Sequence, residues 1–538
     1  MRVLLVYPQF PKSFWSFEKS LELVGKKALM PPLGLITVAA ILPQTWEFKL
    51  VDCNIRLVSK SEWDWADLVI ISAMIVQKED FWHQIQLAKQ HGKSVAVGGP
   101  YPTALPQEAK AMGADYLVLD EGEITLPMFV AALEKGALEG TFRATEKPDV
   151  SQTPVPRFDL LEMSAYDSMA IQFSRGCPFQ CEFCDIIVLY GRKPRTKTPP
   201  QLIVELEALY KLGWRGRVFM VDDNFIGNKR NVKLLLQELK EWMAKHGYPF
   251  KFFTEASVNL AEDPELMELM VACNFYAVFL GIETPDEDSL TLTQKHQNTR
   301  NSLYESVTAI TKSGLMVMSG FIIGFDGEKA GAGDRITQFV EQTSIPIAFF
   351  SMLQALPDTA LWKRLEKEGR LRLQSGDVNQ TTLMNFVPTR PIEEIAQEYI
   401  QAFWKLYDPA RFLDRAYRHY LMMAEPKHKS TAQKMHWLEI RALFKILWRQ
   451  GVISETRKLF WRNFFGIWRY KRSRLTEFIA VCARLEHFLD YREIVCKQIS
   501  KQLAEFQVNE ARITDEHNHN HQVTQLAAHS SSITLARE

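Results

Sequence analysis

The first 140 residues alternate short, almost continuously apolar runs with segments long enough to form helices. Strands that lack polar alternation are buried on both faces, which is typical of a parallel sheet. Five such strands predict an open, doubly wound α/β domain over residues 1–140, whose ligand lies beyond the carboxyl ends of the strands. The five runs are RVLLVY (2–7), EFKLVD (47–52), DLVIIS (67–72), KSVAVGG (93–99) and DYLVLD (115–120).

A proline-containing linker at 141–169 precedes a second alternation of the same kind. Its helical segments include 200–212 and 230–246. Six βα units in a row predict a partial (β/α)6 parallel barrel over 170–390, with the functional residues on the loops after the strands. The six strand candidates are residues 170–175, 217–222, 251–256, 276–283, 315–324 and 346–355.

From residue 391 to 508 the pattern is helical, without strand alternation. Residues 411–474 contain 16 Lys and Arg but only 4 Asp and Glu, interleaved with Trp and Phe. This mixture is typical of an amphipathic helix at a membrane surface, although a helical cap with aromatics facing the barrel has the same composition. The polar tail at 509–538 is predicted to be disordered, and its His-rich stretch to be solvated.

Composition adds limits rather than a function. Lys+Arg and Asp+Glu are both 64, so net charge favours no partner, and nothing besides the basic stretch suggests nucleic acid. The opening residues lack a secretory signal, and no apolar run is long enough to span a membrane. The seven cysteines do not form a disulfide framework. We therefore expect a protein of the reducing cytoplasm, with peripheral contact to the inner face of the membrane as an option.

Three cysteines lie close together after the first strand of the second unit. The segment SRGCPFQCEFCD places Cys177, Cys181 and Cys184 in a CxxxCxxC spacing. Thiolates are soft, anionic ligands that bind iron–sulfur clusters. Three of them can hold three irons of a [4Fe–4S] cluster and leave the fourth iron open. A zinc site is the alternative, but it needs a fourth close ligand, and only Asp185 is near.

The chain resembles the radical S-adenosylmethionine (SAM) superfamily, which has this cysteine spacing at this position of a partial barrel. The resemblance implies that the open iron binds SAM and that reduction yields a 5′-deoxyadenosyl radical. The VDDNF segment departs from the family's Gly-Gly-Glu-like sequence but keeps its polarity. By position in the family, the SAM contacts are expected at Phe183, Asp222, Asp223, Asn224, Glu255, Glu283, Gly320 and Gly324.

The first domain lacks the GxGxxG turn of a dinucleotide site. Its strand ends instead resemble Rossmann-like cobalamin-binding domains that precede radical SAM barrels. The resemblance implies that these strand ends surround the nucleotide tail of cobalamin, and that cobalt has no histidine ligand, because no histidine follows the first strand. The residues concerned are Ser72, Gly98, Gly99, Pro100, Glu121, Gly122 and Glu123.

Longer segments resemble the hopanoid C-2 methylase family. They include MPPLGL (30–35), VDDNFIGN (221–228), GIETPD (281–286) and LQALPDTALW (353–362). The resemblance implies radical methylation of an unactivated lipid carbon with cobalamin as the methyl carrier, and an electron donor such as ferredoxin or flavodoxin. It requires no catalytic acid–base pair, and no His/Asp or Ser/His pair stands out in the sequence. A tetrapyrrole-modifying methylase or cyclase, or a cobalamin or SAM sensor without turnover, are the alternatives.

Overall fold

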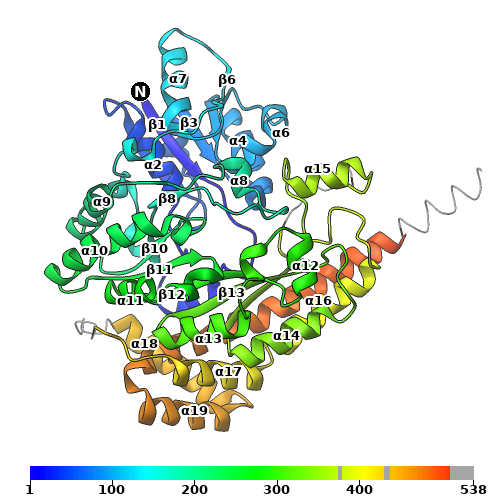
Figure 1. Ribbon diagram of the computed structural model, residues 1–538. Helices are drawn as coiled ribbons and strands as arrows, with labels where there is room; N and C mark the ends of the chain where they lie inside the picture. The colour runs from blue at the N-terminus through cyan, green and yellow to red at the C-terminus, as the bar shows by residue number, and fades with distance from the viewer. Residues whose placement is uncertain (373–378, 429–436, 509–538) are drawn as a thin grey trace, which may run out of the picture.

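The computed structural model describes residues 1–372, 379–428 and 437–508 (Figure 1). Its first sheet is six-stranded and entirely parallel, in the order β2-β1-β3-β4-β5-β6. The five predicted strands are confirmed, and the sixth, GTF, was too short to be recognised. The strands are β1 (Arg2–Tyr7), β2 (Glu47–Asp52), β3 (Leu68–Ser72), β4 (Ser94–Gly98), β5 (Tyr116–Val118) and β6 (Gly140–Phe142).

The strand order reverses at β1, where Val6 pairs with Val51 on one side and Ile71 on the other. Helices cover both faces of this sheet, so both faces carry apolar cores. The doubly wound prediction is therefore confirmed. The helices of this domain are α2 (Leu33–Ile41), α3 (Lys60–Trp65), α4 (Lys78–Gln90), α5 (Pro100–Ala104), α6 (Pro106–Ala111) and α7 (Gly122–Glu134), whereas α1 (Glu18–Leu23) packs on the C-terminal helices.

The second sheet is also six-stranded and parallel, in the order β14-β13-β12-β11-β10-β7. Because β7 and β14 are at opposite edges, the barrel is open, as predicted. The first expected strand is divided, since β7 ends at Ile171 and β8 pairs separately with β9. The strands are β7 (Ser168–Ile171), β8 (Ser174–Arg175), β9 (Arg195–Thr196), β10 (Gly216–Met220), β11 (Phe250–Ala256), β12 (Phe275–Glu283), β13 (Met316–Ile323) and β14 (Ile347–Met352).

Helices α9 to α14 cover the outside of this sheet (Figure 1). The first of them begins with a capping box, in which Thr198 and Gln201 hydrogen-bond each other's backbone N–H, followed by two prolines. The helices of this unit are α8 (Ile186–Leu189), α9 (Pro199–Lys211), α10 (Lys229–Lys245), α11 (Pro264–Ala272), α12 (Glu287–Leu292), α13 (Leu303–Ser313), α14 (Ala332–Thr343) and α15 (Ala360–Lys367).

The C-terminal part is helical, as predicted, and lies below the barrel in Figure 1. None of the helices in the described ranges is long and apolar enough to cross a membrane. The predicted disordered tail lies outside the described residues. The helices are α16 (Ile392–Leu406), α17 (Pro409–Met422), α18 (Trp437–Trp448), α19 (Arg457–Tyr470), α20 (Leu475–Ala483) and a final helix over 485–508.

An arm of residues 8–17 leaves β1 and reaches the barrel and the last helix. The ring of Phe14 stacks on Phe488 with centroids 4.8 Å apart, and the Phe14 carbonyl oxygen lies 3.0 Å from His487 Nε2. Trp15 contacts the rings of Phe279 on β12 and Phe349 on β14, at centroid distances of 5.4 and 5.8 Å. The arm therefore joins the first sheet, the barrel and the C-terminal helices.

Candidate active site

The cysteine loop follows β7, and a backbone hydrogen bond joins its two ends. The N–H of Cys177 donates to the carbonyl oxygen of Gly191 at 3.3 Å. Gly176 has a φ of 92°, and a Cβ atom there would lie 2.8 Å from the same oxygen. Only glycine therefore allows the turn that starts the loop.

The three thiols of this loop share one environment. Cys181 is buried, and Cys177 and Cys184 are partly exposed. Burial raises the pKa of the Cys184 thiol, and the nearby Asp185, Cys181 and Cys177 add to this effect. The three sulfurs therefore lie close enough to influence one another's charge.

Two side-chain amides approach these sulfurs. Asn224 Nδ2 lies 3.8 Å from Cys177 Sγ, and Gln297 Nε2 lies 3.6 Å from Cys181 Sγ. Hydrogen bonds to cluster sulfurs help to set a cluster's reduction potential. Within the described residues, no three His, Cys, Asp or Glu side chains converge closely enough to hold a single ion. Three thiols on one loop can each ligate one iron of a [4Fe–4S] cluster.

Asp222 and Asp223 hold the cysteine loop in place. The Asp222 carboxylate accepts hydrogen bonds from the N–H of Phe173 and of Ser174, each at 2.8 Å, and from Ser174 Oγ at 2.6 Å. Asp223 accepts one from the N–H of Gly176 at 3.1 Å. Burial raises the pKa of Asp222 to about 7 and that of Asp223 to about 6. These contacts show that Asp222 stabilises the start of the cysteine loop. A SAM contact for Asp222 or Asp223 stays a prediction.

Glu255 lies near the end of β11 and points into the barrel. No donor among the described residues hydrogen-bonds its carboxylate. Burial raises its pKa to about 8, and the charges of Asp223 and Asp222 add to the shift. The Glu255 carboxyl group is therefore largely protonated at neutral pH, and it is the strand-end acid most available to a ligand.

Glu283 forms an ion pair with a lysine that was not predicted from the sequence. Its backbone has a φ of 65°, rare for a residue with a side chain, and its buried carboxylate pairs with Lys295. Burial lowers the pKa of Lys295, but the charges of Glu283 and Cys181 outweigh it and raise the pKa overall. The ammonium also lies 5.7 Å from the centre of the Phe183 ring. A fixed positive charge therefore stands beside the cluster loop.

Three residues of this region, Lys295, Gln297 and Asn298, lie on the loop after α12. Asn298 Nδ2 donates to the carbonyl oxygens of Gly281 and Ile282, at 3.0 and 2.9 Å, so this loop folds back on the end of β12. These residues were not predicted from the sequence, because the predicted site residues lie at strand ends and these follow β12 by about a dozen positions. The string KHQN after a short helix was the only sign of them.

The expected adenine segment has partners within the protein. Phe183 contacts Phe325 with ring centroids 5.8 Å apart. Gly324 has a φ of 98°, and a Cβ atom there would lie 2.8 Å from the Met384 methyl group. Glycine is thus required at 324 by packing, whether or not a ligand lies there.

The glycine turn after β4 is similarly tight. Gly99 has a φ of 92°, and a Cβ atom there would lie 2.4 Å from Ser72 Oγ. A Cβ atom at Gly98 would lie 2.7 Å from the carbonyl oxygen of Val118, and Pro100 begins α5. The chain is therefore pressed against the ends of β3 and β5, and this packing requires glycine at 98 and 99 whether or not a ligand lies there. The cobalamin contacts of these residues stay predictions.

Glu121 and Glu123, which follow β5, pair with arginines beside the cysteine loop. Arg175 Nη1 lies 2.8 Å from Glu121, and its Nη2 lies 2.8 Å from Glu123. Arg195 donates to Glu121 at 2.8 Å as well. Helix α5 also contacts α8. The carboxyl ends of the two sheets therefore face each other, with the glycine turn opposite the cysteine loop (Figure 1).

The barrel interior is lined by aromatic rings. Side chains of β11 alternate between buried and partly exposed, and the partly exposed ones face inward. Phe253 stacks on Phe219 of β10 at 4.5 Å. A Cβ atom at Gly320 of β13 would lie 3.0 Å from the Phe279 ring, so this glycine keeps the layer open. The layer consists of Phe219, Phe253, Tyr276, Phe279, Phe349 and, from the arm, Trp15.

Three family models match the chain. Residues 26–130 match the B12 binding domain, residues 171–339 the radical SAM superfamily, and residues 359–501 a domain of unknown function, DUF4070. The first two models cover the sheets whose carboxyl ends face each other.

Two relatives align over nearly the full chain. An uncharacterized methyltransferase of Synechocystis is 64% identical over 507 residues, covering 94% of this chain and 95% of the relative. The hopanoid C-2 methylase of Rhodopseudomonas palustris is 35% identical over 500 residues, covering 91% and 93%. Among solved structures, the radical SAM methyltransferase TsrM of Kitasatospora setae, with cobalamin and a [4Fe–4S] cluster bound, superposes with a TM-score of 0.61. It is 14% identical and covers 91% of this chain and 99% of that chain.

Proposed function

Because the chain belongs to the cobalamin-dependent radical SAM methyltransferases, we propose that it methylates C-2 of a hopanoid or a related polycyclic lipid. Its cofactors are a [4Fe–4S] cluster, SAM and cobalamin. When bound, they supply the radical that removes a hydrogen atom from the substrate and the methyl group that replaces it. Cys177, Cys181 and Cys184 would hold the cluster.

The protein's own contribution is placement. The Asp222 and Asp223 carboxylates fix the start of the cysteine loop, and the pairs between Glu121 and Arg175 and Arg195 fix that loop against the glycine turn. Holding reactants in one geometry lowers the barrier without acid–base chemistry. The aromatic layer inside the barrel also helps to exclude water from a radical reaction.

The aromatic layer inside the barrel is the observation that carries the substrate class. Phe219, Phe253, Phe279, Phe349 and Trp15 present flat apolar faces below the edge that bears the cysteine loop. Such a lining fits a rigid, apolar, fused-ring body. The full-length similarity to a hopanoid C-2 methylase supports the same class. We also propose ferredoxin or flavodoxin as the electron donor, and delivery of the substrate from a membrane.

Lipid mass spectrometry tests this proposal. The gene is expressed in a host that makes hopanoids but does not methylate them, beside Cys181→Ala and the matched variant Cys496→Ala, whose cysteine lies in the last helix. We expect 2-methylhopanoids with the wild type and Cys496→Ala and none with Cys181→Ala. Absence of new lipid, with a protein that carries all three cofactors, would overturn the hopanoid assignment.

A tetrapyrrole is the second candidate substrate, because the same aromatic layer accepts a flat macrocycle. In that case the wild type would leave hopanoids unchanged and alter the absorption spectrum of extracted pigments. The two readouts are made on the same culture.

A further inference from the structure

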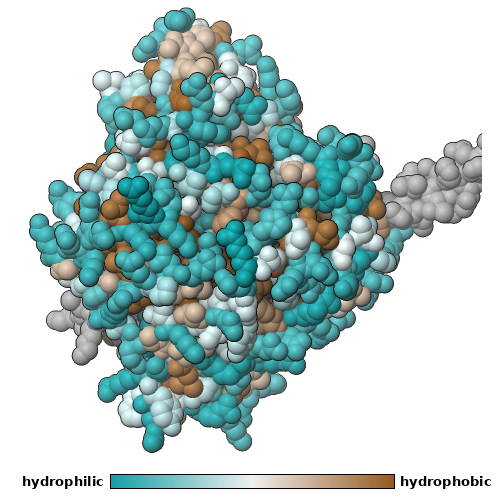
Figure 2. Space-filling view, viewed as in Figure 1, coloured by the Kyte–Doolittle hydropathy of each residue, from teal (hydrophilic) through white to brown (hydrophobic). Residues whose placement is uncertain are grey.

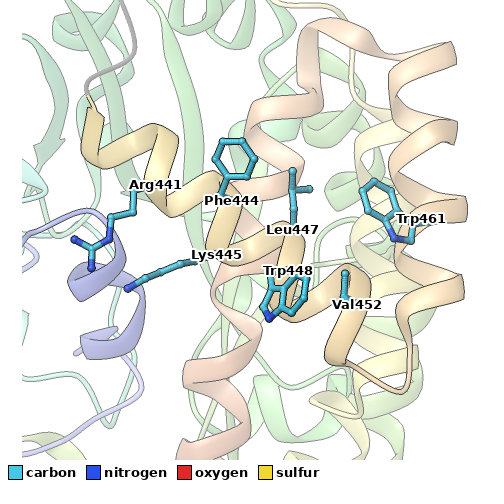
Figure 3. Close-up of a pocket in the computed structure, with 7 residues that line it drawn as sticks. All are labelled: Arg441, Phe444, Lys445, Leu447, Trp448, Val452 and Trp461. Atoms are coloured by element: carbon cyan, nitrogen blue, oxygen red, sulfur yellow. The ribbon is translucent and has the colours of Figure 1, made fainter.

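One side of α18 exposes large aromatic rings to solvent. Trp437, Phe444 and Trp448 are 70%, 69% and 60% exposed. With Arg441 and Lys445 they recur every three or four residues, which places all five on one side of the helix. Figure 3 shows four of these residues along α18, namely Arg441, Phe444, Lys445 and Trp448.

The other side of α18 is its core-facing side. Ala442 and Ile446 are only 3% and 8% exposed and pack with Leu23 of α1. The helix therefore has apolar residues on its core-facing side and large aromatic rings, beside two cations, on its solvent side. A helix at an aqueous surface normally carries polar residues on its free side, so an exposed aromatic side indicates a partner.

The exposed rings continue onto α19. Trp461 Nε1 donates to the carbonyl oxygen of Gly451 at 2.8 Å, and its ring stacks on Phe465 at 5.6 Å. Together with Trp448 and Val452, Trp461 lines a groove of about 510 Å³ (Figure 3). Figure 2 shows brown and near-white residues among the teal ones at the lower end of the molecule, over α19. We call Trp437, Phe444, Trp448, Trp461, Phe465 and Trp468 the aromatic face.

Positive charge is in excess around the aromatic face. Between residues 437 and 472, ion pairs engage Arg449, Arg462 and Lys471. Six other cations in this range form no ion pair with a side chain that the structure describes. They are Arg441, Lys445, Arg457, Lys458, Arg469 and Arg472.

We infer that the aromatic face docks on an anionic phospholipid bilayer; this rests on the lipid substrate proposed above. Aromatic rings settle at the boundary between headgroups and acyl chains, while Lys and Arg bind anionic headgroups. Both requirements are met by the same two helices. A protein partner would need matching acidic and apolar groups, whereas an anionic bilayer offers both over any area.

The docked surface is linked to the barrel interior by α1 and the arm. Helix α1, which packs on α18, directly follows the arm whose Trp15 contacts Phe279 and Phe349 of the aromatic layer. Helix α18, α1 and the arm therefore lie between a bilayer at the aromatic face and that layer.

Sedimentation with vesicles tests the docking. The full-length wild type is expected to sediment with vesicles of phosphatidylcholine and phosphatidylglycerol in equal parts, and much less with phosphatidylcholine alone. Phe444→Ser with Trp448→Ser should weaken binding by roughly tenfold or more, because two largely exposed rings lose their membrane contact. Arg441→Glu with Lys445→Glu should weaken it similarly at low salt.

The matched control is Val204→Ser with Leu234→Ser, which removes exposed apolar residues from α9 and α10 and should bind as the wild type does. Failure of the wild type to sediment, or equal binding by all variants, would overturn the docking. If the docking variants differ from the wild type in oligomeric state without vesicles, the aromatic face is a subunit interface. That result would also overturn the docking proposal. Methylation of detergent-dispersed lipid reports separately on the proposed function, since docking variants should retain it.

Discussion

At the scale of single residues, two acids near the cysteine loop differ in what neutralises them. Glu283 is neutralised by Lys295, whereas Glu255 pairs with no cation among the described residues and instead has its pKa raised to about 8, by burial and then by Asp223 and Asp222. The two sites therefore respond differently to substitution and to pH.

Glu255 makes the protein less stable as pH rises. Because its pKa is higher in the folded state than its usual value near 4.5, its stabilising contribution is complete below that value and is lost as pH rises through about 8. Glu255→Gln cannot ionise, so its melting temperature relative to the wild type should increase between pH 5 and 9. A difference that stays constant over this range would contradict the assignment of the shift to Glu255.

Lys295→Met leaves Glu283 buried without a partner. We expect it to reduce the free energy of unfolding by about 3–5 kcal/mol, the usual cost of breaking a buried ion pair. Adding Glu283→Gln removes the stranded charge, so the double variant should recover much of the loss. Melting temperatures of the two single variants and the double variant measure the coupling; purely additive losses would mean that the pair does not interact.

At the scale of elements, the glycine turn between β4 and α5 is fixed by its neighbours. Gly99→Ala combines an unfavourable positive φ with a clash against Ser72 Oγ. Gly136→Ala is a matched control, because Gly136 also has a positive φ, of 78°, but no atom within 4 Å of the added Cβ. We expect Gly136→Ala to cost about 1 kcal/mol and keep cobalamin uptake, and Gly99→Ala to cost more and lose uptake. Equal uptake, read from the cobalamin absorption spectrum, would argue against a cobalamin cradle at this turn.

The ion pairs of Arg175 hold the two sheets together. Arg175→Met leaves Glu123 without its cation and deprives Glu121 of one of two, and the resulting loosening should expose the linker at 141–169 to protease. Arg157→Met breaks the more exposed pair with Asp159 in the same linker and should change little. Equal digestion rates for the two variants would contradict a role for Arg175 in joining the domains.

At the scale of the whole molecule, the sequence predicted both parallel sheets because fully buried strands leave long apolar runs. It predicted the cysteine loop because three thiols in close spacing have few other uses. It did not reveal the arm of residues 8–17, since Phe14 is buried and Trp15 partly buried by parts of the chain hundreds of positions away. For the same reason it missed Lys295, whose importance depends on where its loop folds back.

Radical methylation of C-2 is tested by the transfer of an isotopically labelled methyl group. The reconstituted protein is incubated with hopanoid, a reductant and SAM whose methyl group is fully deuterated. We expect a C-2-methylated hopanoid that retains every deuterium of the methyl group. We also expect 5′-deoxyadenosine to be released only when substrate is methylated. Release of 5′-deoxyadenosine without a methylated lipid, or a methyl group that has lost deuterium, would contradict it.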